Sequence, residues 1–172
     1  MRNRVSLVFV GAVLSLAPIR VQSQTLALTP LSPEQRWDRA SMHVTLFTAM
    51  FIREGIQAKK SPGQIGRELS GFFGPWTGVT TPAAMAQAIN RNWQLWRSLE
   101  FSAVEQSDGS VRITTNRPYV AALTRYGVIG VTPAEFDDMF ASFHESIASK
   151  QGLVFEQTKD SAAVYMTIRR AK

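Results

Sequence analysis

The chain has 172 residues, enough for one domain with a full hydrophobic core. It contains no cysteine, which excludes disulfides and thiolate metal sites, so the fold must be stabilised by packing alone. Nineteen basic and thirteen acidic residues give a formal net charge of +6, yet no basic run is longer than two residues. That pattern argues against a nucleic-acid-binding protein.

The first residues have the pattern of a secretory signal peptide. Two arginines in MRNR precede the apolar run VSLVFVGAVLSLAP, and Val21 and Ser23 occupy the −3 and −1 positions of a plausible cleavage site. An uncleaved anchor is the alternative, although the run is short for a membrane span. Cleavage after Ser23 predicts one mature domain, residues 24–172, with a net charge of +3. This domain would be periplasmic or secreted, with no membrane attachment.

Four later segments begin with the same signal, a hydroxyl residue followed by proline. A hydroxyl side chain caps the first turn of a helix, and proline suits the first helical position. In three of the four segments, Gln or Glu follows the cap three residues later, as a capping box requires. The predicted caps are Ser32, Ser61, Thr81 and Thr132.

The first three caps predict helices over residues 33–54, 62–73 and 82–99. From Met42 onward the first helix is apolar around most of its circumference, which predicts a central helix buried on several sides. Gly55 is its expected stop. In the third helix, apolar residues recur on one face and end in Trp93 and Trp96.

The pattern then changes to that of β-hairpins. EFSAVEQ and SVRITTN flank Asp108 and Gly109, a pair typical of a hairpin turn. A short helix over 118–126 and a long helix over 133–151 follow, with Gly152 as the stop. The strands LVFEQ and AAVYMTIRR close the chain. We predict an α+β fold, in which two hairpins form a four-stranded antiparallel sheet packed against four to five helices.

The stretch SPGQIGRELSGFFGPWTG, residues 61–78, is rich in glycine. It lacks the spacing of a phosphate-binding P-loop, and no apolar strand precedes it. Gly66, Ser70 and Gly74 recur every four residues, which predicts a strip of small groups where a neighbouring helix packs closely. The alternative is that Trp76, between two glycines, forms a lid over a pocket.

Catalytic chemistry would depend on few residues. The chain has two histidines, His43 and His144, and neither lies in a metal-ligand spacing, so we expect no metal. Asp137 precedes His144 by two helical turns, where a carboxylate could orient the imidazole. An exposed pair without function would have the same spacing. No motif identifies a cofactor.

Aromatic residues crowd the middle of the chain, which suggests either a well-filled core or an apolar pocket with a few polar groups. An arginine and a tyrosine at the NRPYV junction could bind a carboxylate there, or pair with a neighbouring acid. The candidate ligand-binding residues are Phe73, Trp76, Arg91, Trp93, Arg117 and Tyr119.

The order of elements from Phe101 onward resembles that of a family. The segments DGSVRITTNRPYV and GLVFEQTKDSAAVYMTIRR carry the resemblance, over less than half of the chain. The family comprises L-2-amino-thiazoline-4-carboxylic acid hydrolase-like proteins and the related 4-vinyl reductase-type small-molecule domains. RPY stands where that family has a Cys-Pro junction, and this chain has no cysteine. The resemblance therefore implies the fold and a pocket, but no cysteine-dependent activity.

Three functions remain open. The first is an exported domain that binds a small, largely apolar ligand, with or without a carboxylate, between helices and sheet. The second is a histidine-dependent hydrolase. The third is a protein-interaction domain without a pocket, exposing a cluster of Trp or Phe. We expect neither nucleic acid nor membrane as a partner; the sequence does not indicate the oligomeric state.

Overall fold

The computed structural model describes residues 30–125 and 127–171. The chain divides into two units, Met1–Pro30 and Leu31–Lys172, and every element described below lies in the second. The predicted signal peptide falls in residues 1–23, outside the described residues. Among the described helices, none combines the length and apolar character needed to span a lipid bilayer.

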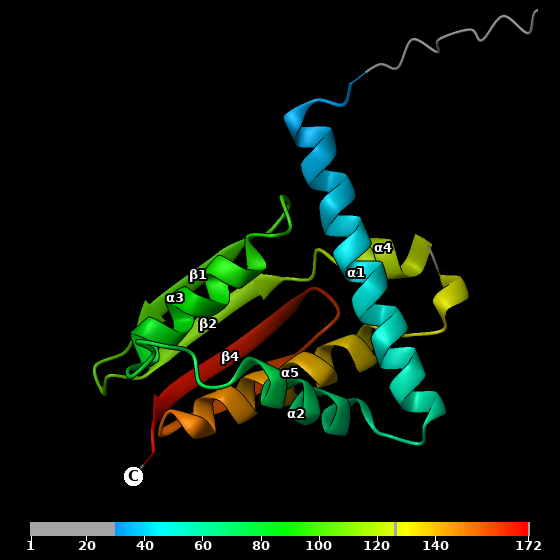
Figure 1. The fold of residues 1–172 in the computed structure, drawn as a ribbon. Helices are drawn as coiled ribbons and strands as arrows, with labels where there is room; N and C mark the ends of the chain where they lie inside the picture. Colours follow the sequence, from blue (N-terminus) through cyan, green and yellow to red (C-terminus); the bar gives the residue numbers. More distant parts are fainter. Residues whose placement is uncertain (1–29, 126, 172) are drawn as a thin grey trace, which may run out of the picture. The chain divides into compact units, whose positions relative to one another are not determined.

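Among the described residues the unit contains five α-helices, four β-strands and one short 3-10 helix (Figure 1). The helices are α1 (Pro33–Gln57), α2 (Pro62–Phe73), α3 (Pro82–Trp93), α4 (Val120–Arg125) and α5 (Pro133–Lys150), and the 3-10 helix is η1 (Gly127–Ile129). The strands are β1 (Phe101–Glu105), β2 (Val111–Asn116), β3 (Leu153–Lys159) and β4 (Ala163–Arg170). The predicted α+β class is confirmed.

All four predicted helix caps are confirmed. Each hydroxyl side chain accepts a hydrogen bond from the backbone N–H three residues later, and proline follows each cap. At Ser32, Ser61 and Thr132 the capping box is complete, because the Gln or Glu side chain also accepts from the backbone N–H of the cap residue. These local hydrogen bonds fix where α1, α2 and α5 begin.

The two hairpins form one antiparallel sheet in the order β1-β2-β4-β3. β2 pairs with β4, so that Val111 lies opposite Ile168 and Ile113 opposite Met166. These residues are buried, whereas their neighbours along each strand are largely exposed. The sheet therefore has one covered and one open face, which is common in antiparallel sheets.

The covered face packs against helices. α5 contacts β3, and α3 contacts β1, β2 and β4. α2 packs on α5, and α1 contacts α2, α4, α5 and η1 (Figure 1). Helices α3 and α5 thus form the layer next to the sheet.

Two predicted helix ends are wrong. α1 continues past Gly55 to Gln57, and the left-handed residue that follows it is Lys59, with φ of 65°. Gly55 instead allows the side chain of Ile65 to approach closely, since a Cβ there would collide with it. The third helix, predicted to run to residue 99, ends at Trp93 and continues as a series of turns.

The prediction that α1 is a central helix is also wrong. Its buried residues are mostly small or polar, namely Ser41, Thr45, Ala49 and Ile52. Its larger apolar residues reach the surface, including Trp37, Val44, Phe47, Met50 and Phe51. The helix therefore buries its small-residue side and leaves an apolar stripe outside.

Candidate functional site

An apolar pocket of about 390 Å³ lies among four helices, and we call it the aromatic pocket. α1, α2 and α5 contribute to its walls, together with the end of α3 and the turns that follow it. No strand residue lines it, so the pocket lies between helices rather than between helices and sheet. Its lining residues are Val44, Thr48, Leu69, Phe73, Trp76, Asn92, Trp93, Leu95, Trp96, Phe140, Phe143 and His144.

His144 is the buried ionisable residue of this pocket, with only 1% of its surface exposed. Five aromatic rings surround its imidazole at centroid distances of 5.3 to 6.2 Å; they belong to Trp76, Trp93, Phe140, Phe143 and Phe155. Burial among these rings lowers the pKa of His144 to about 3, because a charged imidazolium would lose its hydration. His144 is therefore a neutral imidazole at physiological pH.

Two ring nitrogens beside the pocket are buried without a hydrogen-bond partner: Nε1 of Trp93 and Nδ1 of His144. The two rings are neighbours, with centroids 6.2 Å apart. Buried polar groups in proteins are nearly always hydrogen-bonded, so an unpaired one needs an explanation. A polar group that reaches these nitrogens would supply the missing hydrogen bonds.

The lining of the aromatic pocket contains no Lys, Arg, Asp or Glu. Its polar side chains are those of Thr48, Asn92, His144 and the indoles of the tryptophans. A charged ligand would lose its hydration there without gaining a counter-ion, which is costly. The pocket therefore favours an uncharged ligand.

Trp76 covers His144 from the connection between α2 and α3. Its indole contacts the rings of Phe143 and His144, with centroids about 6 Å away. Gly74 and Gly78, on either side, adopt φ values of 60° and 79°, which L side chains rarely adopt. The side chain of Gln151, the residue that follows the last turn of α5, donates a hydrogen bond of 3.1 Å to the carbonyl of Trp76. The loop is thus tied down at one backbone point, between two conformationally free glycines.

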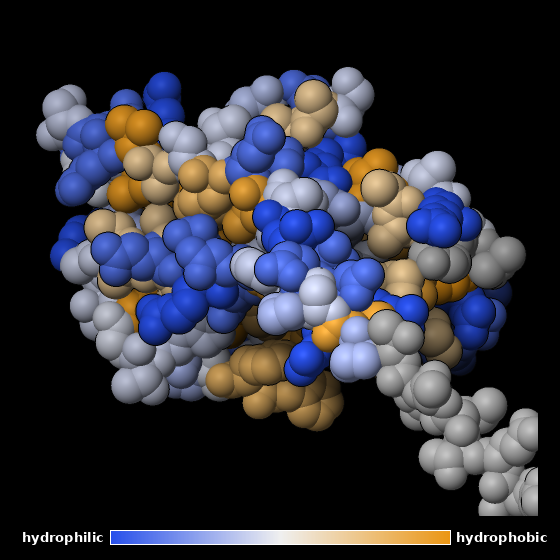
Figure 2. All heavy atoms as spheres, turned by 90° about the horizontal axis from the view of Figure 1, so that it is seen from above, coloured by the Kyte–Doolittle hydropathy of each residue, from blue (hydrophilic) through white to orange (hydrophobic). Residues whose placement is uncertain are grey.

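The rim of the pocket is apolar and exposed. Phe73 lines the pocket although 62% of its surface is accessible, and its neighbour Phe72 is 84% accessible. Val44 also lines the pocket and is partly exposed, one helical turn from exposed Phe47. In the space-filling view from above, orange hydrophobic residues reach the surface among blue hydrophilic ones (Figure 2).

The structure brings four of the predicted site residues together in the aromatic pocket: Phe73, Trp76, Trp93 and His144. His43 and Arg91 do not line it. Both are exposed, His43 on α1 next to Phe47 and Arg91 in the last turn of α3.

Arg117, Tyr119 and Asp137 form a separate buried cluster. The guanidinium of Arg117 and the hydroxyl of Tyr119 each donate a short hydrogen bond to the carboxylate of Asp137. The ammonium of Lys159 lies 3.6 Å from the same carboxylate, and Gln157 donates to the backbone carbonyl of Asp137. Asp137 therefore pairs with these groups, and the proposed orientation of His144 by Asp137 has no hydrogen bond to support it among the described residues.

Burial and hydrogen bonding raise the pKa values of Tyr119 and Arg117 in this cluster. Burial raises the pKa of Tyr119 well above its usual range, and the hydrogen bond to Asp137 raises it further. Burial opposes the charge of Arg117, but Tyr119 and Asp137 more than offset this and raise its pKa. The polar ends of Arg117 and Tyr119 are thus engaged inside the protein rather than directed at the aromatic pocket.

Several lining residues escaped the sequence-based prediction. Val44, Thr48 and Leu69 carry no chemical signature, and they reach the pocket only through the packing of α1 and α2. Phe140 and Phe143 of α5 also line the pocket, and neither was among the candidate ligand-binding residues. The signal in the sequence that indicates the aromatic pocket is the concentration of aromatic residues.

Within the described residues, no three His, Asp or Glu side chains are placed to hold a metal ion. Comparison with family models and with curated proteins finds no match for this chain. The resemblance in element order to the small-molecule domains named above therefore stays a prediction.

Proposed function

We propose that this protein is an exported domain that binds a small, uncharged and largely apolar ligand in the aromatic pocket. One observation carries the proposal. Phe73, Trp76, Trp93 and His144 converge on a pocket without charged lining, beside two buried ring nitrogens that lack partners. Ligand sites are typically apolar and aromatic, with a few placed polar groups.

The ligand would carry at least one oxygen. The indole N–H of Trp93 can only donate, so it needs an acceptor, whereas neutral His144 can accept at one ring nitrogen and donate at the other. A hydroxyl group suits both. The nitrogens lie beneath the pocket surface, so ligand entry involves movement of exposed Phe73 or of Trp76 between its glycines.

Naphthalen-2-ol is a suitable probe, and calorimetry would measure its binding to the whole domain. We expect Phe73→Ala to weaken binding by about tenfold, because it removes an apolar wall. Phe72→Ala is the matched control, since Phe72 is the adjacent, more exposed phenylalanine and does not line the pocket. Equal effects of the two substitutions would contradict the assigned site.

Native mass spectrometry of protein purified from its own source would test the proposal in general. A co-purified small molecule that is lost in Trp76→Ala supports ligand binding. Protein of the bare chain mass, bound to a stable protein partner, would favour an interaction domain instead. The exposed aromatic residues on α1 and α2 are the observation behind that second candidate.

A histidine-dependent hydrolase has weaker support. Neutral His144 could accept a proton, and it lies in the pocket. A general base of this kind is normally oriented by a carboxylate or pairs with a nucleophilic hydroxyl. Among the described residues, His144 has aromatic neighbours and no such hydrogen bond.

A further inference from the structure

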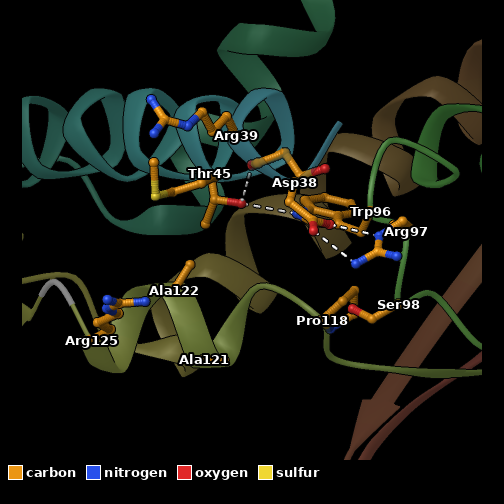
Figure 3. A pocket seen from close by; sticks show the side chains of 12 residues that line it. Asp38, Arg39, Thr45, Trp96, Arg97, Ser98, Pro118, Ala121, Ala122 and Arg125 are labelled. Atoms are coloured by element: carbon orange, nitrogen blue, oxygen red, sulfur yellow. Dashed lines mark hydrogen bonds and ion pairs between the residues drawn. The ribbon is translucent and has the colours of Figure 1, made fainter. Parts of the chain in front are cut away.

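A second pocket, of about 340 Å³, lies between α1 and α4 (Figure 3). We call it the arginine pocket. It shares Trp96 with the aromatic pocket but differs in chemistry. Its lining residues are Asp38, Arg39, Ser41, Met42, Thr45, Trp96, Arg97, Ser98, Pro118, Ala121, Ala122 and Arg125.

One part of this lining is apolar, with Met42, Trp96, Pro118 and two alanines of α4. The indole Nε1 of Trp96 donates a hydrogen bond of 2.9 Å to Thr45 Oγ1, which satisfies the only polar atom of its ring. Trp96 is buried and held in place, so it presents a fixed apolar surface. An aromatic or aliphatic group can pack against it.

The charged part of the lining consists mostly of arginines. Three arginines face a single acid, Asp38, which accepts two hydrogen bonds of 2.8 Å from Arg97. These bonds lower the pKa of Asp38 and raise that of Arg97, so both stay charged and neutralise each other. Arg39 on α1 and Arg125 on α4 also line the pocket, from opposite sides (Figure 3). Arg39 has no ion-pair partner among residues 30–125 and 127–171.

We propose that the arginine pocket binds an organic anion, a carboxylate or sulfonate attached to an apolar ring or chain. The apolar body packs on Trp96 and Met42, while the anionic group pairs with Arg39 and Arg125. Guanidinium groups bind such oxygens with strong, charge-assisted hydrogen bonds. This site differs in its ligand from the aromatic pocket, which favours uncharged ligands, although the two share Trp96.

Calorimetry with naphthalene-2-carboxylate, and with naphthalene-2-carboxamide as its uncharged counterpart, tests the proposal on the whole domain. We expect the carboxylate to bind about tenfold more tightly than the amide, and more weakly as salt rises from about 0.02 M to about 0.5 M. Arg39→Gln and Arg125→Gln should each weaken carboxylate binding about fivefold. Arg112→Gln, on the open sheet face, should leave it unchanged.

Phe73→Ala distinguishes the two pockets, because Phe73 lines only the aromatic pocket. The proposal predicts unchanged carboxylate binding in this variant. Equal affinity for carboxylate and amide, absence of carboxylate binding, or loss of it in Phe73→Ala would each overturn the proposal. A thermal melt checks that the variants fold, and Arg39→Gln, on the exposed side of a long helix, keeps the test decisive if Arg125→Gln is destabilised.

Discussion

His144 shows how strongly a single buried residue can couple this fold to pH. Its imidazole contacts five aromatic rings. Burial holds its pKa at about 3, against an ordinary value of 6.5. Above pH 6.5 the residue is neutral in both the folded and the unfolded chain. As pH falls from 6.5 toward 3, the unfolded chain binds a proton that the folded protein excludes, so the free energy of unfolding decreases.

We therefore expect His144 to lower the free energy of unfolding by about 2 kcal/mol when the pH falls from 7 to 5. Urea unfolding at both pH values measures it, and His144→Phe should remove this part of the loss. His43→Gln is the control, because His43 is exposed on α1 and should leave the loss unchanged. If the wild type and His144→Phe lose equal stability, burial does not prevent the protonation of His144 in the folded protein.

At this scale the sequence identified residue types but not their partners. Asp137 and His144 share a stripe of α5, which suggested an acid–base pair. In the structure Asp137 pairs with Arg117 and Tyr119, whereas His144 lies among aromatic rings. Spacing along one helix indicates which residues share a face, but the neighbouring elements determine which groups each side chain contacts.

At the scale of elements, the contact of α2 with α5 depends on one glycine. A Cβ on Gly66 would fall on the carbonyl oxygen of Met139 and come within 2.9 Å of the backbone nitrogen of Phe143. The predicted close packing joint is confirmed at this position. Gly74, predicted to share the strip, has open space around it and instead adopts a positive φ at the end of α2.

Gly66 and Gly71 lie in the same helix and form a matched pair for substitution. We expect Gly66→Ala to lower the free energy of unfolding by about 2 kcal/mol, because α2 must move away from the backbone of α5. Gly71→Ala should raise it by up to about 1 kcal/mol, since nothing lies within 4 Å and alanine favours a helix. Urea denaturation measures both, and a neutral Gly66→Ala would contradict the close contact.

α1 is the element that sequence reasoning placed wrongly. Its apolar residues cover most of its circumference, a pattern that normally predicts burial on several sides. The structure buries the face with Ser41, Thr45 and Ala49, where small side chains permit close packing, and exposes Phe47 to 68%. Hydropathy alone does not distinguish an apolar face that is buried from one that surrounds the opening of a pocket.

At the scale of the whole molecule, the Asp137 cluster links parts that are distant in the sequence. Asp137 belongs to α5, Lys159 to β3, and Arg117 and Tyr119 to the segment that follows β2. One carboxylate thus connects the two hairpins and the helix between them. Removal of one member leaves the remaining buried charges without compensation.

We expect Asp137→Asn to lower the free energy of unfolding by about 3 kcal/mol. The adjacent Asp138 is the control, because it is exposed and pairs with Lys159 at the surface. Asp138→Asn should cost less than about 1 kcal/mol, as exposed ion pairs contribute little. Thermal or urea unfolding compares the two, and equal losses would show that the buried cluster does not link the hairpins energetically.

The sequence by itself determined the α+β class, the four helix starts, the Asp108–Gly109 turn and the pairing of each hairpin. These features depend on hydrogen bonds and backbone preferences that act within a few residues, so the local sequence contains the needed information. Only the tertiary structure decided that α1 continues past Gly55, that Asp137 pairs with Arg117 and Tyr119, and that Trp96 separates two pockets of different charge. Those outcomes depend on contacts between residues far apart in the chain, which packing selects and periodicity does not reveal.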